Sequence, residues 1–414
     1  MADARNHAIV YGASGIIGWA LVDQLLKHYP APGTFSKVTA ITNRPLDLSK
    51  SFWPEKRPTG PELELVSGIN LSSDGVSLAD ILRERVKDIE NVTHVYYLVF
   101  TAMEDDVEEV ATNYRMFQRV IDVHNVTSPR LKFVAFPGGT RGYGIYVPGG
   151  TFTPPLREEM VKSLPSDYSK TVVYPAYREM LTKASDGKSW TWCEVCPDTI
   201  IGFTPNGSQF SLALHWAQYL SLYAFNHDIK PRSQSKSSRV EVPFPGSTLG
   251  ANSLHTPVSS KILARFMIYA SLSPEKCGGG RLFNIADRAK PCTANEVWPQ
   301  LASWFGLKGV QPPDTEPAGE ELKAGQLPNS TPNLLPGEYT SRYQRLFAEY
   351  GCLNAAHAGV GVGNRQLDSV GYWLTFDRQL SLDRIRECGF EEEQDPVKGW
   401  LESFELFQKA GLIL

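Results

Sequence analysis

Tyr174 and Arg178 are spaced for joint chemistry, because residues four apart share one face of a helix. Tyr174 opens a helix-like segment, and Pro175 fits its first turn, where the N–H that proline lacks has no partner in any case. A phenol donates a hydrogen bond to a substrate oxygen, and a neighbouring cation lowers the pKa of that phenol. The pair predicts a catalytic Tyr174 assisted by Arg178, which polarises the hydroxyl without relaying its proton. The alternative is that Tyr174 and Tyr177 are packing aromatics.

Arg141 is a second cation that could act on a substrate. It follows an expected strand, in the stretch Phe136-Pro137-Gly138-Gly139-Thr140-Arg141-Gly142-Tyr143. Its guanidinium could hold an oxyanion or a cofactor ribose, and the Thr140 hydroxyl could replace that of a catalytic serine. Arg141 is therefore the third catalytic candidate.

Three glycines predict where a cofactor binds. Gly12, Gly15 and Gly18 follow the apolar stretch at 8–11 and run into a helix-like segment that starts at Ile16. A strand that ends in such a turn directs backbone N–H groups and the positive end of the next helix at a pyrophosphate, and only glycine permits the close approach. The GxxGxxG spacing is the form found in short-chain dehydrogenases and reductases, so we expect a dinucleotide here.

The end of the second expected strand indicates which dinucleotide. Asn43 and Arg44 stand where an NAD site would carry an acid for the ribose 2′-hydroxyl. An arginine pairs with a 2′-phosphate through a charge-assisted fork, whereas a carboxylate would repel that phosphate. NADPH is favoured over NADH, unless Arg44 is simply a solvated loop cation.

Alternating strand and helix patterns fill the first half of the chain and would position these residues. We expect strands at 7–11, 37–42, 63–67, 94–99, 131–136 and 191–196, and helices at 16–28, 77–88, 105–124 and 174–185. This pattern predicts an α/β fold with a Rossmann-type, doubly wound parallel sheet. Ligands of such sheets lie across the carboxyl ends of the strands, so the following loops should converge on one cleft.

The alternation stops after 205, which predicts a second part. We expect residues 1–205, with 254–290 returning to them, to form the NADP-binding domain, and 206–414 to form a smaller, mostly helical substrate lid, mainly from 206–253 and 291–414. An apolar, aromatic helix at 210–226 would belong to the lid. Polar or Pro- and Gly-rich stretches at 233–250, 309–337 and 355–364 are expected as loops or surface excursions.

Composition excludes several function classes. The 414 residues are 42% hydrophobic and 21% charged, with a net charge of -4, so there is no basic field for nucleic acid. No stretch approaches the roughly 20 apolar residues of a membrane span. No signal segment precedes the first strand, so we expect a cytoplasmic protein with reduced cysteines. Cys193 and Cys196 point to opposite faces of a strand, and we expect no metal site. The protein could assemble as a homodimer.

Several stretches in order resemble the progesterone 5β-reductase and iridoid synthase family of extended short-chain reductases. They lie at 12–18, 42–45, 92–97, 113–117, 140–143 and 197–205, and the C-terminal pattern at 372–373 and 382–390 is also similar, so the resemblance spans nearly the whole chain. It departs from the family at two places. Arg141 takes the place of a lysine, and Pro197-Asp198 stands where the family has Pro-Gly.

The resemblance implies NADPH-dependent hydride transfer to an activated C=C bond of an enone or enal. Tyr174 takes the place of the family's tyrosine and Arg141 that of its lysine, and both can stabilise a developing enolate. A lipophilic small molecule would be the substrate, in specialised metabolism. Ketone reduction by the same tyrosine, with Arg178 in place of a lysine, and a non-catalytic NADP sensor are the alternatives.

The expected contacts complete this interpretation. The cofactor would touch the glycine turn, the ends of several strands and Tyr174: Gly12, Ser14, Gly15, Ile16, Ile17, Gly18, Asn43, Arg44, Asn70, Val99, Tyr174, Pro197, Thr199 and Ile200. The substrate would lie against apolar and aromatic side chains: Phe100, Tyr143, Phe203 and Trp216. The alternative for the 210–226 helix is that its aromatic residues only pack the lid onto the sheet and do not contact substrate.

Overall fold

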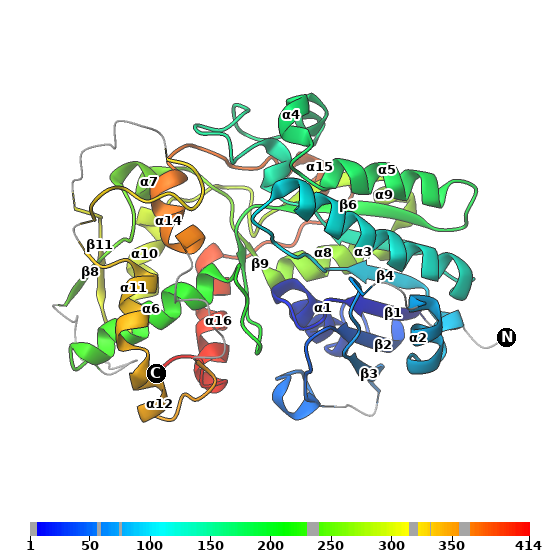
Figure 1. Ribbon diagram of the computed structural model, residues 1–414, viewed down its shortest axis with the longest axis horizontal. Helices are drawn as coiled ribbons and strands as arrows, with labels where there is room; N and C mark the ends of the chain where they lie inside the picture. Colours follow the sequence, from blue (N-terminus) through cyan, green and yellow to red (C-terminus); the bar gives the residue numbers. More distant parts are fainter. Residues whose placement is uncertain are drawn as a thin grey trace.

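The computed structural model describes residues 6–55, 59–73, 77–229, 240–313, 322–331, 333–355 and 365–414. Figure 1 shows a sheet with helices on both faces, beside a second, mostly helical region formed by later parts of the chain.

The main sheet has seven parallel strands in the order β10-β6-β5-β4-β1-β2-β3. Its strands are β1 Asn6–Tyr11, β2 Phe35–Thr42, β3 Glu62–Ser67, β4 His94–Tyr97, β5 Phe133–Pro137, β6 Thr191–Pro197 and β10 Arg281–Ile285. The chain runs outward from β1 to β3 and then returns to β4 on the other side of β1. This reversal creates the crevice in which doubly wound sheets bind ligands. The predicted fold class is confirmed.

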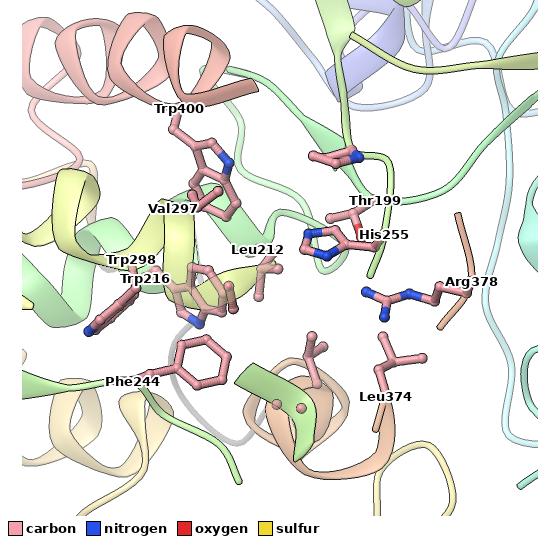
Figure 2. A pocket seen from close by; sticks show the side chains of 15 residues that line it. Thr199, Leu212, Trp216, Phe244, His255, Val297, Trp298, Leu374, Arg378 and Trp400 are labelled. Carbon is pink, nitrogen blue, oxygen red and sulfur yellow. The ribbon is translucent and has the colours of Figure 1, made fainter. Parts of the chain in front are cut away.

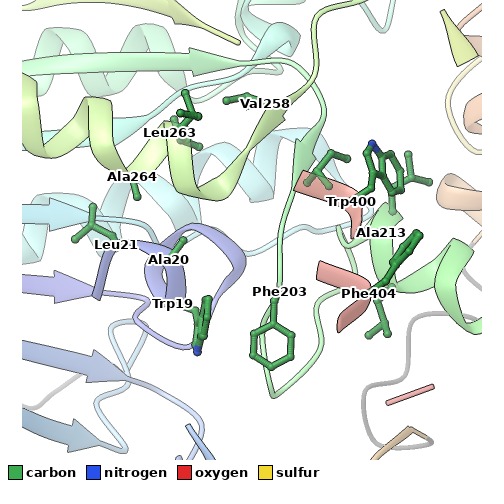
Figure 3. Packing of buried hydrophobic residues seen from close by; sticks show 14 of the residues in the cluster. Trp19, Ala20, Leu21, Phe203, Ala213, Val258, Leu263, Ala264, Trp400 and Phe404 are labelled. Atoms are coloured by element: carbon green, nitrogen blue, oxygen red, sulfur yellow. The ribbon is translucent and has the colours of Figure 1, made fainter. Parts of the chain in front are cut away.

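Both faces of the sheet are buried, which explains its nearly continuous apolar strands. Successive side chains of a strand point to opposite faces. In β1, Ala8 and Val10 accordingly join one hydrophobic cluster, and Ile9 and Tyr11 join another. Helices α1 Ile16–Leu26 and α8 Ser260–Leu272 contribute to the first cluster, and α2 Leu78–Arg85, α3 Asp106–Thr127 and α5 Tyr174–Ser185 to the second. Figure 3 shows α1 and α8 meeting through small and branched side chains.

The helical region is built around aromatic side chains. Trp216 stacks on Trp400 with ring centroids 5.1 Å apart, and Trp298 meets Trp216 edge-on at 5.4 Å. These residues come from helices far apart in the chain, α6 Leu212–Asn226, α10 Ala294–Trp304 and α16 Pro396–Lys409. The remaining elements are α4 Ser166–Ser169, β7 Ile200–Ile201, β8 Glu241–Pro243, α7 Thr248–Asn252, β9 Val258–Ser259, α9 Pro274–Cys277, β11 Lys308–Val310, α11 Pro336–Tyr343, α12 Arg345–Glu349, α14 Arg365–Trp373 and α15 Asp383–Glu387.

Some details differ from the expectations. Helix α1 ends before 28 because His28 adopts a left-handed conformation at φ 68°. Strand β11 pairs with β8, so ordered structure enters the expected surface excursion at 309–337. Parts of the expected loops at 233–250, 309–337 and 355–364 lie outside the described residues. The division into a cofactor domain and a lid stays a prediction, although β10 does lie in the main sheet.

Membrane insertion finds no support in the helices. Among those in the described ranges, none combines the length and the apolar character needed to cross a bilayer.

Asp287 is a buried carboxylate that should make stability depend on pH. Its Oδ1 accepts hydrogen bonds from the Ser259 N–H (2.9 Å), the Ser259 hydroxyl (2.7 Å) and the Gln394 amide (3.2 Å). Burial raises the pKa of Asp287 to about 7, whereas the unfolded chain titrates near 3.8. Because the folded state holds the proton more tightly, stability should fall as pH rises from about 4 to 7, by a few kcal/mol.

Urea unfolding between pH 4.5 and 8 checks this expectation. Asp287→Asn keeps the accepting oxygen and cannot ionise, so its stability should lose most of that pH slope. An unchanged slope in the variant would assign the pH dependence to other groups.

Candidate active site

The glycine turn after β1 lies at the crevice of the sheet. Gly12 adopts φ 79°, and a Cβ there would come 2.6 Å from the carbonyl oxygen of Leu98, at the end of β4. A Cβ on Gly18 would overlap the Gly12 carbonyl oxygen. Both positions therefore require glycine, one for its conformation and one for the contact between helix and turn.

The start of α1 is suited to bind an anion. Gly15 is its N-cap, and among the residues that the structure describes no side chain caps the first amides of the helix. Unpaired N–H groups and the helix dipole at such an end favour a phosphate. The Ser14 carbonyl accepts a hydrogen bond of 2.6 Å from the Thr204 hydroxyl, and this bond fixes the turn. These residues could hold the pyrophosphate of a dinucleotide.

The other expected cofactor residues lie mostly near the carboxyl ends of the strands. Val99 faces Gly12, with its Cγ2 atom 3.3 Å from the Cβ position there. Asn43, Arg44 and Asn70 are exposed after β2 and β3. Pro197 ends β6, Thr199 follows it, and Ile200 begins β7.

Arg44 keeps its charge available for a ligand. Its guanidinium lies 3.4 Å from the carbonyl oxygens of Asn206 and Gly207, and no carboxylate in the described part of the chain pairs with it. Two long bonds to neutral acceptors leave the cation uncompensated beside the crevice.

Tyr174 is half-buried at the start of α5, where its ring packs on the loop after β5. Its hydroxyl lies 2.9 Å from the Cβ position of Gly139, and its ring 3.3 Å from that of Gly142. Within the described residues the hydroxyl has no hydrogen-bond partner. Burial raises the pKa of Tyr174, while the charge of Arg141 lowers it. The phenol is therefore neutral at physiological pH and free to donate to a bound molecule.

Arg178 lies on the same helix face but is bound elsewhere. Its Nε and Nη2 atoms contact the Glu194 carboxylate at 2.5 and 3.0 Å, and the side chain of Glu194 is only 1% exposed. The glutamate compensates the charge of Arg178, and it raises the pKa of Tyr174. The sequence analysis missed Glu194, although a charged residue inside an apolar strand signals a buried partner.

Arg141 is also held by acidic residues. Its guanidinium contacts Glu109 at 2.6 Å and Asp106 at 3.1 Å, both at the start of α3, and donates to the Thr171 carbonyl at 3.0 Å. It also lies over the ring of Tyr146, 5.0 Å from the centroid. Arg141 therefore acts on Tyr174 through its field. The two acids were not among the expected site residues.

Thr140 joins this loop to the helical region. Its hydroxyl donates to Asp198 Oδ1 at 3.1 Å, and Asp198 Oδ2 lies 3.3 Å from Arg378 Nε. The side chains of Asp198 and Arg378 are 4% and 5% exposed. Burial raises the pKa of Asp198, and the nearby Arg378 opposes that rise. Sequence reasoning did not single out Arg378, which lies 180 positions from its partner.

A cavity, here called the tryptophan cavity, lies where the loop after β6 meets the helical region. Figure 2 shows Thr199, His255 and Arg378 at one end and aromatic side chains at the other. It measures about 40 Å³ and is lined by Thr199, Leu212, Trp216, Phe244, Gly250, His255, Pro257, Ala294, Val297, Trp298, Val370, Gly371, Leu374, Arg378 and Trp400. The structure thus brings Trp216 and Thr199 to one cavity.

The other expected substrate residues lie elsewhere. Phe203 is 1% exposed and packs edge-on against Trp19, with centroids 4.8 Å apart (Figure 3). Tyr143 is 1% exposed and donates to Asn284 at 2.6 Å. Phe100 is half-buried and faces the exposed Phe210 at 6.0 Å. None of the three lines the tryptophan cavity.

Metal-ligating side chains do not gather in the described ranges, where no group of three histidines, cysteines or acids could hold an ion.

Comparison with known proteins shows the family of this chain. The model of the PRISE-like Rossmann-fold domain matches residues 8–414. The chain is 30% identical to the short chain dehydrogenase ausT of Aspergillus calidoustus, over 100% of this chain and 96% of that one. It is 24% identical to the 3-oxo-Delta(4,5)-steroid 5-beta-reductase of Arabidopsis thaliana, over 97% and 92%.

A solved structure shares the fold. The GDP-mannoheptose C4 reductase MlghC of Campylobacter jejuni, with NADP bound, superposes with a TM-score of 0.55 at 14% identity, over 99% of this chain and 100% of that one. With the dinucleotide turn, the seven-stranded sheet and a family match over nearly its whole length, this chain belongs to the PRISE-like Rossmann-fold family and is an oxidoreductase of the extended short-chain dehydrogenase/reductase type.

Proposed function

We propose that the protein is an NADPH-dependent reductase that adds hydride to an activated C=C bond of a lipophilic enone or enal. The observation that carries this proposal is the Tyr174 hydroxyl, which is neutral and without a partner in the described residues. It lies against the loop after β5, at the same carboxyl edge of the sheet as the glycine turn after β1. The name of the steroid 5-beta-reductase relative supports the same chemistry.

The side chains favour C=C over C=O reduction. Bound nicotinamide supplies the hydride. The charge that develops on the carbonyl oxygen of an enone needs a hydrogen-bond donor, which Tyr174 provides. Arg141 is paired with Glu109 and Asp106 but still lowers the pKa of that phenol, which makes Tyr174 a better donor.

The enolate left by hydride addition takes its proton at the α-carbon, from water, and needs no acid on the oxygen. Reduction of a ketone instead requires the proton at the oxygen itself, resupplied through a neighbouring group. Arg178 is bound to Glu194 and cannot relay a proton, so it does not replace a lysine in that role.

Turnover tests separate the candidate functions. The enzyme should oxidise NADPH with cinnamaldehyde or 4-cholesten-3-one and form the saturated carbonyl product. Formation of allylic alcohols would show that the enzyme reduces the carbonyl group instead of the C=C bond. No NADPH oxidation with a broad panel of enals, enones and ketones, despite tight NADPH binding, would favour the sensor.

Arg44 should determine the choice of cofactor. Arg44→Ala removes the cation that would contact the 2′-phosphate, so NADPH affinity should fall by about 1–3 kcal/mol while NADH affinity changes little. Fluorescence titration with both cofactors measures this. Arg83→Ala, which removes an exposed arginine on α2 paired with Asp80, is the matched control. Equal losses of affinity for NADPH and NADH would show that Arg44 does not contact the 2′-phosphate.

A further inference from the structure

We propose that the tryptophan cavity binds the carbonyl-bearing end of a neutral molecule through Arg378, and that Asp198 makes this cavity reject carboxylates. The inference rests on the proposed function only in taking the molecule that enters the cavity to be the substrate, whose carbonyl group at Arg378 is then a second one, separate from the enone oxygen at Tyr174. The binding itself needs no turnover.

The far end of the cavity selects for apolar groups. Trp216, Trp298 and Phe244 meet edge to face, with centroids 5.4 to 5.8 Å apart, and Trp400 stacks on Trp216. The indole N–H of Trp298 is used by the Val242 carbonyl, at 3.0 Å. A bound molecule therefore meets mainly ring surface there. A volume of about 40 Å³ leaves room for only a few non-hydrogen atoms, so the cavity takes one end group of a ligand and not a whole polycyclic molecule.

The near end offers a donor that lacks a good acceptor. Arg378 is 4% exposed, its Nη1 atom donates to Ser253 over a long 3.3 Å, and its Nε atom makes no well-aligned hydrogen bond. Among the described residues no acceptor takes the protons of Nη2. Figure 2 shows the guanidinium pointing into the space between Leu374 and His255. A buried donor of this kind gains from an acceptor that a ligand brings.

His255 adds an acceptor beside this donor. Its Nδ1 lies 3.4 Å from the Ser253 carbonyl oxygen, which can only accept, so Nδ1 carries the proton. Burial, together with the charge of Arg378, lowers the pKa of His255 to about 3, so the ring is neutral and its Nε2 carries a lone pair. A group with both a carbonyl oxygen and an N–H or O–H matches the two side chains.

Asp198 determines the charge of the ligand group that can bind to Arg378. Its carboxylate lies 3.3 Å from Arg378 Nε and is fixed by Thr140, so the cation of Arg378 is already balanced. A second carboxylate on Arg378 would meet the field of Asp198 in a site with little water to screen it. A neutral carbonyl group meets no such repulsion, and it still takes the free protons of Arg378.

Three probes of one shape test this proposal on the full chain. Isobutyramide, 3-methyl-2-butanone and isobutyrate share an isopropyl-carbonyl skeleton and differ in charge and donor capacity. Their dissociation constants are measured by ligand-observed NMR titration with and without NADP⁺. The wild type should bind the amide about tenfold more tightly than the carboxylate, with the ketone between them. Equal binding of amide and carboxylate would overturn the proposal.

Two variants locate the effect. Arg378→Met should weaken the amide and the ketone about tenfold, since a hydrogen bond from a charged donor is lost. Asp198→Asn leaves the cation unbalanced and should strengthen isobutyrate about tenfold, with little change for the amide. If Asp198→Asn leaves isobutyrate binding unchanged, Asp198 does not control charge selection.

A control separates these effects from general damage. Arg265→Met removes a partly buried arginine of α8 that pairs with Glu392 and does not line the tryptophan cavity, so all three affinities should stay unchanged. Circular dichroism reports whether each variant folds. If the Arg378 and Asp198 variants do not fold, the relative affinities of the wild type for isobutyramide and isobutyrate still test the proposal. Because no NADPH is consumed, failure of the reductase assignment leaves this test intact.

Discussion

Tyr174→Phe should lower kcat about 100- to 1,000-fold, because it removes the donor that stabilises charge on the substrate oxygen in the transition state. KM should change little, since the contact strengthens only as that charge develops. The hydroxyl has no partner among the described residues, so its loss leaves no buried group unpaired and stability should stay close to that of the wild type. Steady-state kinetics with NADPH and the best substrate of the enal and enone panel measure the effect.

Tyr177→Phe is the matched control. Tyr177 lies one turn further along α5 but is 3% exposed, with its ring edge-on to Phe117 at 4.9 Å. Removal of its hydroxyl changes the core beneath the helix and not the crevice, so kcat should remain within about twofold of the wild type. Full turnover by Tyr174→Phe, or an equal loss in both variants, would show that Tyr174 does not carry the oxyanion.

Gly18→Ala should abolish useful cofactor binding, with an NADPH dissociation constant raised about 100-fold or more. The added methyl group would overlap the Gly12 carbonyl oxygen and lie 2.8 Å from the Ala13 Cα atom. These are backbone atoms, so no side-chain rotation relieves the contact, and α1 must move away from the turn. Its first amides then no longer converge on the pyrophosphate. Protein and NADPH fluorescence titrations measure the loss.

Stability must be measured alongside binding, because overpacking itself costs about 1–3 kcal/mol. Gly33→Ala is the comparison: Gly33 has φ 81° and open space around its Cβ position, so its replacement strains the backbone away from the turn. It should lower stability by about 1–2 kcal/mol and leave NADPH binding intact. Normal NADPH affinity in Gly18→Ala would mean that the cofactor is held elsewhere.

Local features of the sequence were sufficient to predict the sheet, the glycine turn and the start of α5. Strand alternation, glycine spacing and Pro175 after Tyr174 are consequences of backbone stereochemistry and side-chain periodicity, which act over a few residues. The ends of elements were less certain, as at α1, where the left-handed His28 gave no clear signal in the sequence.

The partners of the charged residues could not be predicted in this way. Arg141 was expected beside an oxyanion, yet it pairs with Glu109 on another helix, and Arg178 was expected to assist Tyr174, yet it pairs with Glu194. Phe203 was expected against the substrate but fills the core beside Trp19.

The reason is physical. Distant segments of the chain must pack together before a cation meets its carboxylate or an aromatic side chain lines a cavity. The hydrophobic effect that drives this packing is non-directional, so the local sequence does not show which distant residues will meet. The sequence alone therefore predicted the Rossmann-type sheet, its glycine turn and a helix that begins at Tyr174. The packing of α3 and α5 around the sheet determined that Arg141 and Arg178 are compensated, and the packing of the helical region against the sheet brought Asp198 and Arg378 together.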